Sequence, residues 1–163
     1  MNNIQKKPAI KWASALWNSL LVTILSYIAY MIPAFVVAFK MGFELGPKLQ
    51  DPAEVSRQIS QAIPPIYQHN QLLVLGFIIV TALLIFWRGR RIAAGTGEKS
   101  MINGVLVSTI PVLLTVMFLF SRGFQIRSVV EIIIYLLTGY VSGKMAKNSL
   151  PTPAQHPDPN NLS

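Results

Sequence analysis

Residues 128–147 read SVVEIIIYLLTGYVSGKMAK, an apolar block with the length of a membrane-spanning helix, closed by two lysines. At 1.5 Å per residue, twenty helical residues cover about 30 Å, the thickness of the hydrocarbon core of a bilayer. The block holds Glu131, the one acidic residue inside any apolar segment, and a Gly-x-x-x-Gly pair, Gly139 to Gly143. We therefore expect a transmembrane helix with a polar position and a close-packing face.

The composition of the whole chain fits that expectation. Of its 163 residues, 52% are hydrophobic and 12% are charged, against about 25% charged residues in soluble domains. The apolar residues are gathered in long blocks instead of being spread with a helical or strand period. We predict an all-α, polytopic membrane protein with one membrane domain, residues 1–147.

Four apolar blocks predict a four-transmembrane-helix bundle. The predicted spans are residues 13–39, 68–87, 101–120 and 126–146. The first block is uncharged over 27 residues, well beyond the apolar part of a signal peptide, so we interpret it as a retained helix. Residues 148–163 are rich in proline, cannot bury a core and are expected to form a disordered tail.

The connection between the first two spans, residues 40–71, contains its own helix signal. Asp51, Pro52 and Glu54 suit the cap, the first and the third position of a helix. Apolar residues then alternate with polar ones at helical spacing, and Pro64-Pro65 is expected to end the helix. The apolar set is Val55, Ile59, Ala62 and Ile63. We predict a short amphipathic helix that lies on the extracytoplasmic membrane surface or caps the bundle.

The positive charge of the chain predicts its orientation. Lys and Arg exceed Asp and Glu by 14 to 6, for a net charge of +8. Nine basic residues fall on the side of the two termini and the 88–101 loop, and five fall on the other side. The positive-inside rule then places both termini in the cytoplasm, and we expect a bacterial cytoplasmic membrane protein. Because the surplus lies at block ends, it does not indicate a nucleic-acid partner.

Glu131 allows two interpretations. It follows Arg127 by four residues, so the two can form an ion pair on one helical face near the outer end of the span. Alternatively, Glu131 faces the bundle and carries a proton or a cation, and Tyr135 and Thr138 continue the polar track on the same side of the helix.

Two further groups of residues are candidate contacts. Small residues form a packing face around the two glycines, consisting of Gly139, Ser142, Gly143 and Ala146. The sequence does not decide whether this face meets the same chain, a second copy or another protein. A cytoplasmic basic cluster can either hold anionic lipid headgroups or only set the topology; its members are Arg88, Arg90, Arg91 and Lys99.

No pattern in the chain indicates catalysis or a bound cofactor. The chain has no cysteine and two histidines, and it lacks a catalytic triad or a zinc-protease motif, so we expect no metal, no cofactor and no enzymatic activity. The expected function is that of a non-enzymatic accessory or assembly subunit, which packs as a homo-oligomer or against other membrane proteins within the lipid bilayer. The alternatives are a small oligomeric transporter or channel that uses Glu131, and an anionic-lipid-interacting regulatory module.

Overall fold

The structure of the chain is a computed structural model, which describes residues 10–48, 51–122 and 125–148. All elements in these ranges are helices. They are α1 (Trp12–Leu45), α2 (Pro52–His69), α3 (Gln71–Ala93), the 3-10 turn η1 (Gly97–Lys99), α4 (Ser100–Leu106), α5 (Thr109–Arg122) and α6 (Ile126–Asn148). Four segments are long and apolar enough to cross a membrane: Trp12–Leu45, Gln71–Ala93, Gly97–Ser121 and Ile126–Asn148. An all-helical protein with four such segments is confirmed. The predicted tail lies outside the described residues, except for Asn148, which ends α6.

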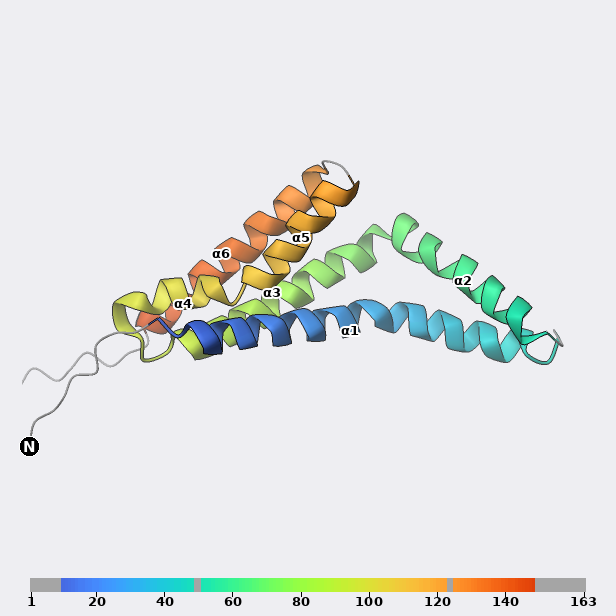
Figure 1. Ribbon diagram of the computed structural model, residues 1–163, viewed down its shortest axis with the longest axis horizontal. Coiled ribbons are helices and arrows are strands. Elements are labelled where there is room, and N and C mark those ends of the chain that lie inside the picture. Colours follow the sequence, from blue (N-terminus) through green and yellow to red (C-terminus); the bar gives the residue numbers. More distant parts are fainter. Residues whose placement is uncertain (1–9, 49–50, 123–124, 149–163) are drawn as a thin grey trace, which may run out of the picture.

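The bundle is built around α6. This helix packs along α3 and α4 and also contacts α5, which precedes it in the chain. Helix α1 packs against α3, α4 and α5. Figure 1 shows α3 to α6 gathered at one end of the molecule, with α1 running the full length beneath them. The fully buried apolar side chains of the described residues include Val22, Ile85, Val107 and, the largest of them, Tyr135. The large apolar residues point outward, as expected for helices whose solvent is lipid.

The predicted third span is not one continuous helix. It divides at Val107 and Ser108, whose amides bond to the carbonyl oxygens of Gly104 and Val105, three residues back. Pro111 explains the division, because a proline ring collides with the carbonyl group four residues earlier, here that of Val107. The segment Gly97–Ser121 is still long and apolar enough to be the third span, but its helix is interrupted at Val107 and Ser108, between α4 and α5.

The predicted loop between the first two spans is largely helical. Pro33 lies inside α1, which continues to Leu45, and α2 continues through Pro64 and Pro65 to His69. The prediction that the paired prolines end that helix is wrong. Tertiary contacts hold the last turn of α2 in place, since the Tyr67 hydroxyl donates to the carbonyl oxygen of Tyr30 at 2.7 Å and the two rings stack 4.3 Å apart.

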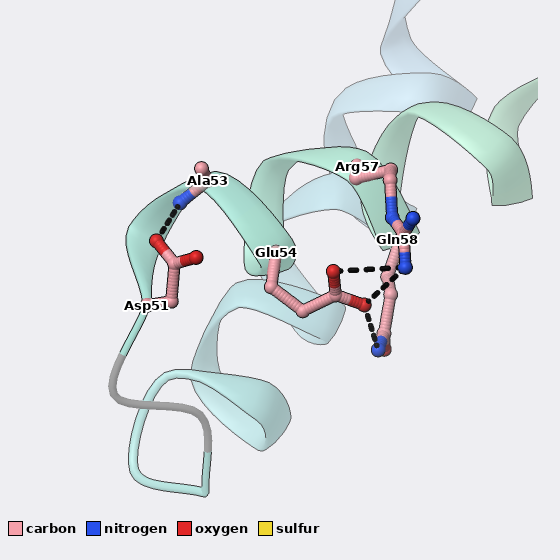
Figure 2. Close-up of polar contacts among 5 residues, drawn as sticks. All are labelled: Asp51, Ala53, Glu54, Arg57 and Gln58. Carbon is pink, nitrogen blue, oxygen red and sulfur yellow. Dashed lines mark hydrogen bonds and ion pairs between the residues drawn. The ribbon is translucent and has the colours of Figure 1, made fainter.

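The start of α2 follows the sequence signal. The Asp51 carboxylate accepts a hydrogen bond from the Ala53 amide at 2.9 Å, and Pro52 occupies the first helical position. Figure 2 shows Glu54 turned toward Arg57 and Gln58, one turn further on. The Gln58 amide and the Arg57 guanidinium each donate to Glu54 at 3.0 Å. These two hydrogen bonds, from Gln58 first and Arg57 second, lower the pKa of the Glu54 carboxyl from its ordinary value, because both favour the charged carboxylate.

The outer part of α1 and α2 together form an arm, which we define as residues 34–45 and Pro52–His69. Tyr30 contacts Tyr67 of α2 and the ring of Phe77 in α3, so the arm begins where α3 begins. Figure 1 shows that both helices of the arm extend past the outer ends of α3, α5 and α6. The arm is thus a helical hairpin that projects from the bundle.

Candidate functional site

The small-residue face of α6 lies inside the molecule. Gly139, Ser142, Gly143 and Ala146 are all buried. An added Cβ atom at Gly143 would stand 2.5 Å from the carbonyl oxygen of Ser100 and 2.6 Å from Cα of Met101. At Gly139 it would stand 2.9 Å from the carbonyl oxygen of Gly104. The α6 backbone therefore lies directly against the α4 backbone.

The third helix completes this close packing. A Cβ atom at Gly89 of α3 would collide with the Ser142 hydroxyl, and one at Gly104 would collide with the backbone of Gly139 and Gly143. The Ser142 hydroxyl is itself satisfied within α6, since it donates to the carbonyl oxygen of Gly139 at 2.7 Å. Because α3 and α4 cover the small-residue face, it is not available as a surface for a partner.

The break between α4 and α5 leaves the Ile110 amide without a partner in its own helix, and α1 supplies the acceptor. The amide of Ile110, in the first turn of α5, donates to the Ser19 hydroxyl oxygen at 2.9 Å, and Ser19 is completely buried. Just before the start of α1, the backbone amide of Lys11 donates to the Asn103 side chain, also at 2.9 Å. Irregular backbone within a membrane requires such partners, because lipid provides none. The pattern of the sequence gave no signal for these two contacts.

We expect Ser19→Ala to destabilise the bundle by about 1–3 kcal/mol, because the partly buried Ile110 amide loses its acceptor. Thr23→Ala is the matched control: the Thr23 hydroxyl donates within α1, to the carbonyl oxygen of Ser19 at 2.9 Å. We expect that control to change stability by no more than about 0.5 kcal/mol. Unfolding in mixed detergent micelles, followed by tryptophan fluorescence, measures both. Equal effects of the two substitutions would contradict the role assigned to Ser19.

Glu131 faces the bundle while remaining paired with Arg127. Its carboxylate lies 3.4 Å from the Arg127 guanidinium, with 12% of the Glu131 side chain exposed and 54% of the Arg127 side chain exposed. Tyr135, one turn further in, is buried and interacts with Thr81 of α3. The Tyr135 hydroxyl nevertheless makes no hydrogen bond of normal geometry. The position of Glu131 is therefore compatible with both interpretations, an ion pair with Arg127 and a carboxylate that faces the bundle.

Thr138 does not extend this polar track. It is half-buried, and its hydroxyl donates to the carbonyl oxygen of Ile134 in the same helix at 2.7 Å. Within the described ranges, no group of three potential metal-ligating side chains comes together. The polar positions that the structure brings together are Arg127, Glu131, Tyr135 and Thr81.

The basic cluster surrounds the C-terminal end of α3. Arg90 and Arg91 are exposed, Lys99 and Arg88 are half-buried, and the Arg88 guanidinium lies 4.8 Å from the ring centre of Trp87. The chain turns sharply here, since Gly95 and Gly97 have φ of 73° and 55°, which suits glycine. The cluster is thus open to a membrane surface, and lipid binding there stays a prediction.

An apolar stripe on the outer half of α1 was not anticipated from the sequence. We define the arm stripe as Phe35, Val36, Phe39 and Phe43, each more than 60% exposed. The opposite side of α1 faces α2, where Ala34 is buried. Toward the bundle the same face of α1 continues as Ile28 and Ile32, which are also exposed. The sequence did not distinguish this face, because residues 13–39 are uncharged and mostly apolar on every side of the helix.

The described helices define a class, that of multi-pass helical membrane proteins. Comparisons with protein-family models, curated proteins and solved structures gave no match for this chain.

Proposed function

We propose that this protein is a non-enzymatic accessory or assembly subunit, which packs against itself or against other membrane proteins. The observation that supports the proposal is the arm stripe. Four large apolar side chains lie exposed on one face of a hairpin that projects beyond the bundle. Large exposed apolar patches mark interaction surfaces. The small-residue face of α6, which suggested a partner surface in the sequence, no longer supports the proposal, because α3 and α4 cover it.

Purification from native membranes in mild detergent tests the proposal. We expect the chain to be recovered in a stoichiometric complex, of identical or different subunits, which is lost when Phe35 and Phe39 are both replaced by serine. Leu83→Ser is the matched control, because Leu83 of α3 is similarly exposed at 62% but lies away from the arm. A wild-type chain that is recovered alone and monomeric would contradict the proposal.

The proposed orientation places both termini in the cytoplasm of a bacterial cell and the arm on the extracytoplasmic side. The distribution of Lys and Arg supports it. The polar outer face of α2, which includes the exposed Ser56, Arg57 and Ser60, suits an aqueous phase or a membrane surface. Ser56→Cys should then react with an impermeant thiol reagent in intact cells, whereas Ala94→Cys, in the exposed turn after α3, should not. The reverse pattern would invert the orientation.

A small oligomeric transporter or channel is the second candidate function. One observation favours it: the Glu131 carboxylate is directed into the bundle, next to Tyr135, instead of toward lipid. Ionisable residues at such positions commonly serve proton or cation pathways.

A further inference from the structure

The fold gathers positive charge from four elements at one end of the bundle. Figure 1 shows the start of α1, the start of α4 and the ends of α3 and α6 converging there. The apolar stretch of each of these elements is bounded by basic residues at this end. We define the basic end as the basic cluster together with the basic residues at the start of α1 and in the last turns of α6; its seven members are Lys11, Arg88, Arg90, Arg91, Lys99, Lys144 and Lys147.

The ends of α3 and α6 are in direct contact at the basic end. A Cβ atom at Gly89 of α3 would collide with the Ser142 hydroxyl of α6. Arg88 directly precedes Gly89, and Lys144 follows Ser142 by two residues. The backbone positions of these two cations therefore belong to one helix contact, although 55 residues separate them in the sequence.

The starts of α4 and α1 join the same end. A Cβ atom at Gly143 of α6 would stand 2.5 Å from the carbonyl oxygen of Ser100, the residue that follows Lys99. The backbone amide of Lys11 donates to the Asn103 side chain of α4 at 2.9 Å. Positive charges that are far apart in the sequence are thus brought to one end of the folded molecule.

This charge is not balanced within the described residues. Glu98 is the one acidic residue beside the basic end, whereas the rest of the described chain has five basic and four acidic residues. The ion pairs among the described residues all involve cations elsewhere: Lys40–Glu44, Arg57–Glu54 and Arg127–Glu131. Five members of the basic end are exposed, namely Lys11, Arg90, Arg91, Lys144 and Lys147. Their counter-charge therefore has to come from outside the described chain.

Arg88 shows that net charge alone does not describe this end. Its guanidinium lies 4.8 Å from the ring centre of Trp87, and its Nε atom is buried without a hydrogen-bond acceptor among the described residues. The positive-inside rule accounts for basic residues at a helix end, but it does not account for a buried donor that lacks an acceptor, which costs free energy. The protein thus positions the Arg88 guanidinium by packing and leaves its anionic partner to come from outside.

Tryptophan residues mark the depth of the basic end. The chain has three, Trp12, Trp17 and Trp87, and each is exposed and lies within two turns of Lys11 or Arg88. Tryptophan is enriched where the hydrocarbon core of a bilayer meets the lipid headgroups. The positive charges therefore lie at the level of the headgroups, where phosphate is the abundant anion.

We propose that the basic end binds the headgroups of anionic phospholipids in the leaflet that surrounds it. This inference goes beyond the proposed subunit function and does not depend on it. Clusters of about four to eight Lys and Arg residues beside a membrane helix are typical of such binding. The exposed cations attract the net negative charge of these lipids, and their headgroup oxygens are acceptors for the Arg88 guanidinium. Charge and depth together select lipid over a soluble anion.

Quenching of tryptophan fluorescence by brominated lipids tests this binding locally, because every tryptophan of the chain lies near the basic end. The purified full chain is reconstituted at low salt in phosphatidylcholine vesicles, in which brominated phosphatidylglycerol or brominated phosphatidylcholine replaces increasing shares of the lipid. We expect phosphatidylglycerol to bind at least about fivefold more tightly than phosphatidylcholine, since each basic residue near an anionic surface contributes roughly this factor. A ratio of the two affinities close to one would overturn the proposal.

Paired substitutions locate the binding. Arg91→Gln/Lys144→Gln removes two exposed cations from the basic end, and the matched control, Lys40→Gln/Lys48→Gln, removes two exposed cations from the far end of α1 and the turn after it. Both pairs change the net charge equally, and circular dichroism checks that helical content is kept. We expect the first pair to lower the preference for phosphatidylglycerol by about fivefold or more and the control to leave it unchanged. An equal loss in both pairs would show that no localised site exists.

Analysis of retained lipid distinguishes phospholipid from other anions. The wild-type chain is purified from native membranes in mild detergent, and its bound phospholipids are compared with those of the membrane. We expect anionic phospholipids to be enriched, and the enrichment to be lost in Arg91→Gln/Lys144→Gln. An acidic protein or a nucleic acid held in place of lipid, through the same two residues, would overturn the proposal, although a retained protein would still support the subunit function. Absence of any enrichment would overturn it as well.

Discussion

Gly143→Ala should lower the free energy of unfolding by about 3 kcal/mol, the largest loss we expect from the smallest possible change in side chain. The new Cβ atom would stand 2.5 Å from the carbonyl oxygen of Ser100 and 2.6 Å from Cα of Met101, both of which are backbone atoms. A side chain can rotate away from such a contact, but α4 can yield only by separating from α6. Detergent-induced unfolding, followed by circular dichroism, measures the loss.

Gly76→Ala is the matched control. Gly76 also lies within a membrane helix, yet a Cβ atom there meets nothing within 4 Å. Alanine favours a helix over glycine by roughly 0.5–1 kcal/mol, so we expect the control to be neutral or slightly stabilising. The double replacement of Gly139 and Gly143 by leucine should prevent the native bundle from forming. If Gly143→Ala were as well tolerated as Gly76→Ala, the close contact of α4 and α6 would be wrong.

The outer boundaries of the membrane helices could be predicted from the sequence because they depend on local composition. Charged residues such as Lys144 stand at block ends, and the apolar length between them fixes how many helices can span. The cap at Asp51 was predictable for the same reason, since a cap involves neighbouring residues only. The effect of the prolines on the helices could not be predicted from the sequence. Pro111 divides a predicted helix, whereas Pro33 and Pro64 lie within continuous ones.

What could not be predicted depends on partners far along the chain. Ser19 and Ile110 are 91 residues apart, and no periodicity relates them. Likewise, the glycine pair of α6 indicates that a helix packs there, but only the three-dimensional arrangement identifies α4 as that helix. In a membrane protein every block is apolar all round, so hydrophobicity does not show which face of a helix is inside. The arm stripe became visible only where α1 leaves the bundle.

Arg127→Gln should lower the free energy of unfolding more than Glu131→Gln does, and it is the second substitution for which we expect a large loss of stability. Removing the guanidinium leaves a carboxylate that is 12% exposed without its counter-charge. Orphaned buried charges cost several kcal/mol, and because the Arg127 side is half-exposed we expect about 1–3 kcal/mol. Glu131→Gln leaves only a neutral amide behind and should cost about 0–1 kcal/mol. The double variant should then be about as stable as Glu131→Gln alone.

The same variants decide whether Glu131 has a role beyond the ion pair. In proteoliposomes that contain a pH-sensitive dye, a structural pair predicts that no variant changes proton or cation flux, whatever its stability. A transport carboxylate predicts that Glu131→Gln abolishes flux at unchanged stability, while Arg127→Gln retains flux wherever it remains folded. Equal destabilisation by the two single substitutions would show instead that Glu131 is as open to solvent as Arg127, and its burial beside Tyr135 would be wrong. Stability and flux together therefore distinguish the subunit from the transporter. A structural ion pair affects stability alone, whereas a transport carboxylate affects the flux.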